Sequence, residues 1–348
     1  MALPEIIPQS VLFGNPDKAE PKLSPDGLRY AYLANSDKGV LNVFVQTLGE
    51  DKAKQITNDT HRGIRMFEWA KNNKSVLYLQ DADGDENWHV YSADLATGVV
   101  RDMTPFQGCR ADDLHTDQKF PDEAIVGLNV RDRAAFDLYR LDLITGALVM
   151  YTENPGNVNQ WICDADFKIR GAVSNDQSDG SKILKVRDSD TSEWRDVASW
   201  PNDETAQFFR FTQDGKGIYI ASSMAHGKGD AKDTTRLVVL SADDGRETEE
   251  VFFDSRCDID EVVFNDGDHA VEAVMVDYDK QEWVVKHSRV QADIDALKAV
   301  CTGTMRITSR STDDTAWIVA DMRDDGSVRD SSTSQAQSCD DPELIQSM

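Results

Sequence analysis

The sequence predicts an all-β protein, a seven-bladed β-propeller with four-stranded blades and an incomplete last blade. Short segments such as "RYAYLA", "SVLYLQ" and "GIYIASS" alternate apolar and polar residues and are bounded by Gly, Asp, Asn or Pro turns, the pattern of half-buried strands. The same four-strand unit recurs roughly every 45 to 50 residues, the period of propeller blades. A β-sandwich is the rival fold, but it would not naturally repeat one such unit seven times.

Each unit is expected to contain an apolar strand, a tight polar turn, a second strand, a polar loop, a third strand with an ending such as "LYRLDLITG", and a fourth strand. Helical periodicity is confined to "VQADIDALKAV", where Ile294, Leu297 and Val300 fall on one side, so we expect one short helix near residues 291–300. The predicted blades start near residues 23, 67, 113, 162, 209, 262 and 306.

The two ends of the chain differ from the repeat. Residues 1–22 are interpreted as a lead-in to a propeller over residues 23–328. After "AWIVADMRDDG" the sequence becomes rich in Ser, Asp and Gln and poor in β-branched residues, which predicts a disordered tail over residues 329–348. The last blade would then lack strands. Because an unpaired strand edge invites aggregation, we expect marginal stability or self-association.

Composition restricts the classes of partner. Among 348 residues, 63 acidic side chains outnumber 37 basic ones and give a net charge of −26, which disfavours nucleic acid and anionic membranes. The absence of a long apolar run and of a basic leader favours a cytoplasmic protein without a membrane span. The five cysteines have no C-x-x-C spacing and the six histidines no H-E-x-x-H spacing, so we expect no disulfide framework, metal site or cofactor.

The stretch "DADGDENWHVYSADLATG", Asp81 to Gly98, gathers acids in a loop between two predicted strands. An EF-hand calcium loop requires glycine at its sixth position and a glutamate at its twelfth, but Glu86 and Ser92 stand there. A looser calcium turn stays open. Asp85 and Glu86 do not suit glycoside hydrolysis, because neighbours on an extended chain point in opposite directions. A polar hairpin loop is favoured, since other units place polar residues at the same point.

These loops should share one face of the propeller. We expect that face to be either a salt-bridged solvent surface or a surface that contacts a peptide or a partner domain. No nucleophile is assigned to it or elsewhere, because Ser222 and Ser223 near His226 lack the elbow of a hydrolase. The residues expected on the face are Asp85, Glu86, Asn87, Arg62, Arg65 and Arg131, together with Arg110, Arg133 and Asn159.

Several segments taken together resemble a known family. "IPQSVLFGNPDKAEPKLSPDGLRYAYLA", "GDENWHVYSADL" and "VGLNVRDRAAFDLYRLDLITG" are similar to the N-terminal β-propeller of the prolyl oligopeptidase family of serine peptidases, in its acylaminoacyl-peptidase and dipeptidyl aminopeptidase-like members. The resemblance covers about residues 6–328, and G-D-E-N-W is its most specific part.

The resemblance implies a non-catalytic role. In that family an α/β-hydrolase domain carries the Ser, Asp and His triad, while the propeller covers the active site, admits peptides and helps to hold them. The sequence contains no G-x-S-x-G motif, so no catalytic residue is transferred to this chain. The implied partners are the hydrolase domain and peptides.

Two other functions stay open at this point. A stand-alone TolB-like propeller would serve as a protein-interaction scaffold. An autonomous propeller enzyme, such as a lactonase or a glycosidase, is less favoured because no inward-facing acid or metal cluster is evident in the sequence.

Overall fold

The computed structural model describes most of the chain as two compact units. Unit 1 comprises Met1–Gln107 and Cys301–Met348, and unit 2 comprises Gly108–Val300. The described residues are 13–224, 233–324, 328–334 and 343–345, with Ile6, Pro8 and Gln9.

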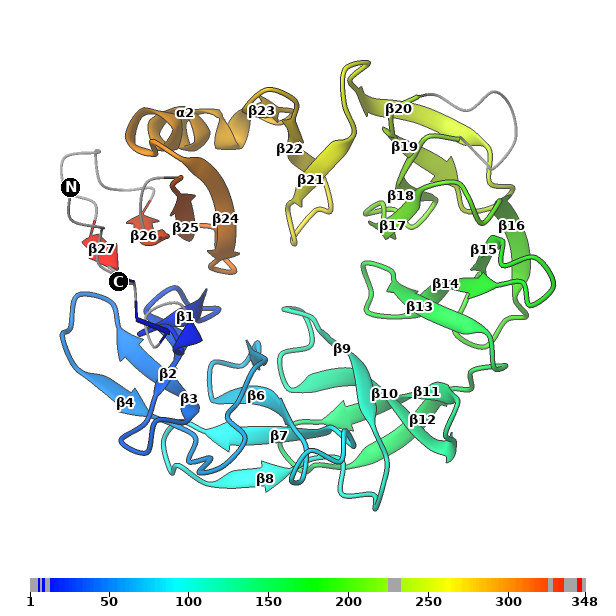
Figure 1. The fold of residues 1–348 in the computed structure, drawn as a ribbon. Coiled ribbons are helices and arrows are strands. Elements are labelled where there is room, and N and C mark those ends of the chain that lie inside the picture. Colours follow the sequence, from blue (N-terminus) through cyan, green and yellow to red (C-terminus); the bar gives the residue numbers. More distant parts are fainter. Residues whose placement is uncertain are drawn as a thin grey trace. The chain divides into compact units, whose positions relative to one another are not determined.

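Unit 1 contains three antiparallel sheets, each a meander of four strands in chain order, which we call blades (Figure 1). The strands are β1 (Ala19–Leu23), β2 (Arg29–Asn35), β3 (Leu41–Thr47) and β4 (Ala53–Gln55); β5 (Phe67–Trp69), β6 (Ser75–Gln80), β7 (His89–Asp94) and β8 (Val100–Asp102); and β24 (Thr304–Arg310), β25 (Ala316–Met322), β26 (Arg329–Ser334) and β27 (Glu343–Ile345).

Unit 2 contains three more four-stranded blades, one three-stranded sheet and a short helix (Figure 1). Its elements are β9 (Ala111–Thr116), β10 (Glu123–Asp132), β11 (Ala135–Asp142) and β12 (Leu148–Thr152); β13 (Val158–Cys163), β14 (Ile169–Asn175), β15 (Lys182–Val186) and β16 (Arg195–Trp200); β17 (Ala206–Phe211), β18 (Gly217–Ser222), β19 (Arg236–Ser241) and β20 (Glu247–Phe253); and β21 (Ile259–Phe264), β22 (Val271–Asp277), β23 (Gln281–Val285), η2 (Ser288–Val290) and α2 (Gln291–Val300).

The all-β, propeller-type class is confirmed, as is the short helix, but the prediction of seven four-stranded blades is wrong. The described residues form six four-stranded blades and a three-stranded sheet, β21–β23. Beyond β23 the chain forms α2 instead of a fourth strand. Ile294 and Leu297 on this helix are buried, and Lys298 Nζ donates a hydrogen bond to the Trp283 carbonyl on β23. The helix thus covers the side of the sheet where a fourth strand would lie.

The prediction of an incomplete last blade is also wrong. β26 pairs with β25 from Arg329 to Ser334, and β27 pairs with β26. Both strands lie within the segment predicted as a disordered tail, whose other residues, 335–342 and 346–348, lie outside the described residues. Sheet pairing uses backbone groups that every residue except proline supplies in full, so a polar sequence can form a strand without the alternating pattern that sequence analysis detects.

The core lies on the middle strands of the blades because those strands are covered on both faces. In β18 five of six residues are buried, and in β22 six of seven. Trp69, Trp200 and Phe211 are among the largest side chains fully removed from solvent. Apolar burial of this kind is the dominant stabilising contribution.

Arginines join successive blades within each unit. The Arg29 guanidinium donates to the Asn73 carbonyl and stacks on the Trp69 ring of the next blade. In unit 2, Arg170 likewise donates to the Gly215 carbonyl and stacks on Phe211. The same long cationic side chain therefore packs on an aromatic ring and satisfies a turn carbonyl.

Within the described residues, no helix is long and apolar enough to cross a membrane.

Candidate functional site

The loop between β6 and β7 is held in one conformation by its own acids. Asp83, Gly84 and Glu86 have φ values of 54°, 87° and 59°, in the left-handed region that non-glycine residues rarely adopt. The buried Asp81 carboxylate accepts a hydrogen bond from the Glu86 backbone N–H at 3.2 Å. Such strained conformations persist only where surrounding contacts fix them. The loop therefore presents its side chains from a fixed backbone.

Arg62, from the connection between β4 and β5, anchors this loop. Its Nε lies 3.5 Å from Asp81 Oδ1. Its guanidinium also packs on Gly84, where an added Cβ would approach Nη1 to 3.2 Å. This distance is that of an ion pair, and within the described residues Asp81 Oδ1 accepts no hydrogen bond. Arg62 thus supports the loop instead of projecting freely into solvent.

Asp85 and Asn87 bind each other. Asn87 donates to Asp85 through its backbone N–H at 3.1 Å and its side-chain amide at 3.0 Å. These hydrogen bonds, the one from the side chain first, hold the pKa of Asp85 below its usual value. The carboxylates of Asp81 and Asp85 are thus both used inside the loop. Over the described residues, no group of three or more His, Cys, Asp or Glu side chains could hold a metal ion.

Among the candidate residues of unit 1, Glu86 and Arg65 keep their charges available. Both are exposed, and neither side chain has a hydrogen bond or ion pair with the described part of the chain. Glu86 follows Asp85 on the locked loop, and Arg65 follows Arg62 on the connection to β5. A fixed backbone that carries an unpaired charged side chain is suited to bind a ligand or a partner, because little conformational entropy is lost.

Arg131, in unit 2, is a structural clamp. Its guanidinium makes two hydrogen bonds of 2.8 Å with the carboxylate of Asp137, which is fully buried. It also donates to the Asn154 carbonyl at 2.9 Å. These contacts tie β11 to the connection between β12 and β13. The hydrogen bonds to Asp137 also raise the pKa of Arg131.

The other candidate residues differ in their surroundings. In unit 2, Arg133 donates to the Gly108 carbonyl, while Arg110 and Asn159 are exposed.

Ser222 Oγ donates to the Thr205 and Met224 carbonyls, and Ser223 Oγ donates to Glu204 at 2.6 Å. Both hydroxyls are therefore engaged in local structure, and His226 lies outside the described residues.

Sequence reasoning missed Asp113, a carboxyl group of unit 2 with a raised pKa. It lies in a β-bulge, because two residues of β9 stand opposite one residue of β10 between the pairs Asp112–Gly127 and His115–Ile125. Its φ is 49°, and its carboxylate has no hydrogen-bond partner within the described residues. Burial, with the nearby charge of Asp112, raises the pKa of Asp113 to about 6. The acidic pair in "DDLHT" was the available signal, but the bulge is invisible in sequence.

Comparisons with known proteins agree with this picture. No protein-family model matches the sequence. The dipeptidyl aminopeptidase BIII of Pseudoxanthomonas mexicana is 33% identical over 317 residues, which are 91% of this chain and 45% of that protein. The dipeptidyl peptidase family member 6 of Caenorhabditis elegans is 25% identical over 333 residues, 90% of this chain and 44% of that protein. This chain therefore spans slightly less than half the length of the curated relatives it matches.

A solved structure shows the same fold. A puromycin-hydrolysing peptidase of Mycobacterium tuberculosis superposes with a TM-score of 0.60 at 10% identity, over 95% of this chain and 53% of that one. The repeated antiparallel sheets are those of a propeller-type protein. Its loops carry exposed polar side chains, and no nucleophile is assigned among the described residues. The relatives agree with the resemblance seen in the sequence: over about nine tenths of its length, the chain is similar to dipeptidyl aminopeptidases and dipeptidyl peptidases, and it matches less than half of each of them.

Proposed function

We propose that this chain is the non-catalytic propeller of a serine peptidase of the prolyl oligopeptidase family, and that it controls which peptides reach the catalytic residues of an α/β-hydrolase domain. The observation that carries the proposal is the extent of the match. It covers 91% of this chain but only 45% of the dipeptidyl aminopeptidase. What the two sequences share is therefore the part built from blades.

The β6–β7 loop is the proposed contact surface. In this proposal Glu86 and Arg65 meet the peptide or the hydrolase domain, because their charges have no partner within the described residues. Asp85, Asn87 and Arg62 keep the loop in shape. Arg131 does not contact the ligand in this proposal, because its guanidinium already binds the Asp137 carboxylate and the Asn154 carbonyl. A carboxylate such as Glu86 would favour a peptide ammonium or an arginine of the partner domain.

The activity of the isolated chain tests this proposal. We expect no hydrolysis of dipeptidyl naphthylamides, lactones or glycosides, and no labelling of any serine by a fluorophosphonate probe, because the nucleophile elbow is absent from this sequence. A serine hydrolase of known activity is the positive control for both assays. Turnover by the purified chain that persists through repurification would contradict a non-catalytic role and favour an autonomous propeller enzyme.

A further inference from the structure

The outer strand β12 of unit 2 is an open and uncharged edge (Figure 1). It pairs with β11 on one side, and no described strand pairs with its other side. Residues 143–152, "LITGALVMYT", contain no charged side chain, although 29% of the whole chain is charged. In this run Ile144, Val149 and Met150 are 56%, 64% and 46% exposed. Apolar side chains therefore stand in solvent along a strand that is able to pair further.

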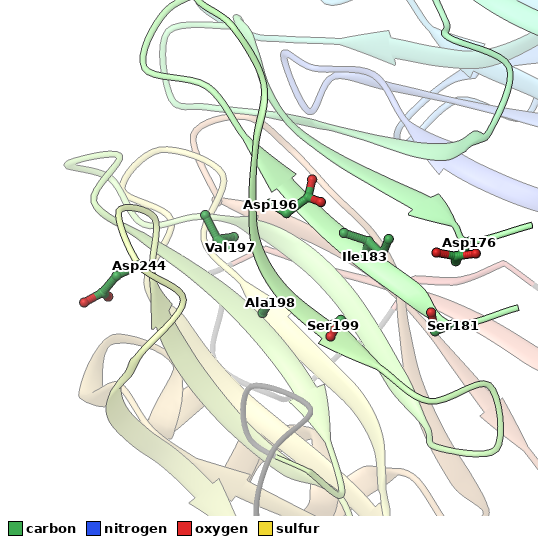
Figure 2. A pocket seen from close by; sticks show the side chains of 8 residues that line it. All are labelled: Asp176, Ser181, Ile183, Asp196, Val197, Ala198, Ser199 and Asp244. Carbon is green, nitrogen blue, oxygen red and sulfur yellow. The ribbon is translucent and has the colours of Figure 1, made fainter. Parts of the chain in front are cut away.

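The outer strands of the other blades carry charges, which oppose pairing with another chain. β16 is an example, because it contains Arg195 and Asp196. Asp196 borders a hollow on its blade together with Asp244 of the next blade (Figure 2). The remaining outer strands of the described four-stranded blades also contain charged residues, among them Lys54 in β4, Arg101 in β8, Glu249 in β20 and Glu343 in β27. Among these six strands, β12 alone lacks a charge.

The backbone of β12 offers hydrogen bonds on its open side. The Ala147 carbonyl accepts a hydrogen bond from the Asp142 N–H of β11 at 2.9 Å. Backbone groups of an antiparallel strand point alternately toward and away from the neighbouring strand. Val149, two residues further on, therefore also directs its backbone groups toward β11. Leu148 and Met150 direct their N–H and C=O groups outward, where a further strand is able to pair with them.

This arrangement matches a second copy of the same strand about a twofold axis at Val149. When Val149 lies opposite its own counterpart, Leu148 of each copy faces Met150 of the other, and each such pair exchanges two backbone hydrogen bonds. The side chains that meet are then valine with valine and leucine with methionine. A β-bulge at Tyr151 ends the straight part of the edge, so the contact is short.

We propose that this edge binds a second copy of the chain, and that the two β12 strands pair antiparallel in a symmetric dimer. Charge favours this occupant. With a net charge of −26, two copies repel each other over most of their surface, and an uncharged edge is where they can approach. The twofold axis closes the assembly at two copies. This contact involves neither the corrected last blade nor the β6–β7 loop.

Sedimentation velocity of the purified chain measures the dimer. An edge contact of this size belongs to the weak, transient class, so the runs cover about 5 to about 300 µM protein. We expect a monomer–dimer equilibrium that strengthens when NaCl rises from about 0.05 to about 0.5 M, because salt screens the repulsion between acidic copies. A monomer at every concentration and salt level overturns the proposal, and so does a dimer that salt weakens.

The variant Val149→Lys should weaken dimerisation about tenfold, because it places two lysines directly opposite each other at the axis. Val99→Lys is the matched control. It makes the same change of charge at a valine of similar exposure, 61%, in the β7–β8 turn, and should change the dissociation constant less than about twofold. Unchanged thermal unfolding shows that both variants are folded. Equal effects of the two variants on dimerisation would contradict a contact at β12.

Cysteine cross-linking tests the register of the two strands. Val149→Cys should form a disulfide with its counterpart under mild oxidation, because directly opposite residues that exchange no backbone hydrogen bonds lie within disulfide distance. Met150→Cys should not, since it faces Leu148 of the other copy. The unsubstituted chain, with its own five cysteines, is the control for background cross-linking. Equal cross-linking by the two variants would rule out the proposed pairing.

Hydrogen exchange separates this dimer from other occupants of the edge. Amide exchange in residues 147–151 should slow as the protein concentration rises, because the dimer protects the outward N–H groups. Protection that is independent of protein concentration would assign the edge to a contact within one chain and overturn the proposal. Protection that appears only when a separate hydrolase domain is added would assign the edge to that domain and overturn it as well.

Discussion

At the scale of single residues, the acids named here have different surroundings that the sequence does not distinguish. Asp81 and Asp137 are buried and bind arginines. Asp85 completes a turn with Asn87. Glu86 is exposed, and its side chain has no partner in the described part of the chain. All are acidic residues in polar surroundings of the sequence, and only the fold determines which of them an arginine reaches.

Asp113 gives a prediction about pH. Its pKa of about 6 in the folded chain lies above the usual value of 3.8. The folded state therefore holds a proton that the unfolded state releases between these values. This contribution to stability is complete below pH 3.8 and is lost as the pH rises through 6.

The variant Asp113→Asn should consequently be more stable than the native chain by about 2 kcal/mol above pH 6.5, with the gain shrinking toward zero at pH 4. Urea unfolding at several pH values measures it. Asp112→Asn is the control, because it removes only the repulsive neighbour and should give a smaller gain. A gain that is independent of pH would show that Asp113 is not the titrating group.

At the scale of elements, two turns between third and fourth strands have the same backbone conformation but different neighbours. In the β7–β8 turn, Gly98 N–H donates to the Asp94 carbonyl, and in the β19–β20 turn Gly245 N–H donates to the Ser241 carbonyl, both at 2.9 Å. Their φ values are 72° and 68°. Gly98 has open space around it, whereas Gly245 packs against the Val197 carbonyl.

This pair of glycines forms a matched test. Gly98→Ala should lower the free energy of unfolding by about 1 kcal/mol, because a residue with a side chain is strained in the left-handed conformation. Gly245→Ala carries the same backbone cost and a clash with β16, so the loss should reach about 3 kcal/mol. Equilibrium unfolding measures both. Equal losses would mean that the β19–β20 turn does not pack on β16 as described.

The strands were largely predictable, and the exceptions have physical causes. Strands such as β6 and β18 bury most of their residues and are bounded by turn residues, so their composition and periodicity reveal them. β26 escaped because its sequence lacks that periodicity and its pairing depends on the backbone. The missing fourth strand beside β23 was unexpected because a short amphipathic helix gives no indication of which edge it covers.

At the scale of the whole molecule, the corrected last blade changes one expectation. The marginal stability or self-association expected from sequence rested on an open last blade, and that premise is wrong. β1 and β24 are joined instead, since Leu23 N–H donates to Ser309 Oγ at 2.9 Å. Tyr30, Tyr32 and Ile318 share a buried cluster between the first and last blades.

The candidate site was only partly predictable, because some of its features are local in sequence and others depend on tertiary contacts. The loop Asp81–Trp88 was placed correctly between its two strands, because turn composition is local. The contact of Arg131 with the Asn154 carbonyl, and the lack of a partner for Glu86 among the described residues, depend on which segments the fold brings together. No pattern in a single sequence reports such contacts.

The activity of a hybrid enzyme tests the central claim most directly. In the hybrid, this chain replaces the matching part of the dipeptidyl aminopeptidase of Pseudoxanthomonas mexicana. We predict that it cleaves short dipeptidyl substrates and spares a folded protein of equal concentration, and that Glu86→Gln raises KM while kcat stays unchanged. A folded hybrid that degrades the folded protein as fast as the short substrate would contradict the claim, as would one without activity toward either.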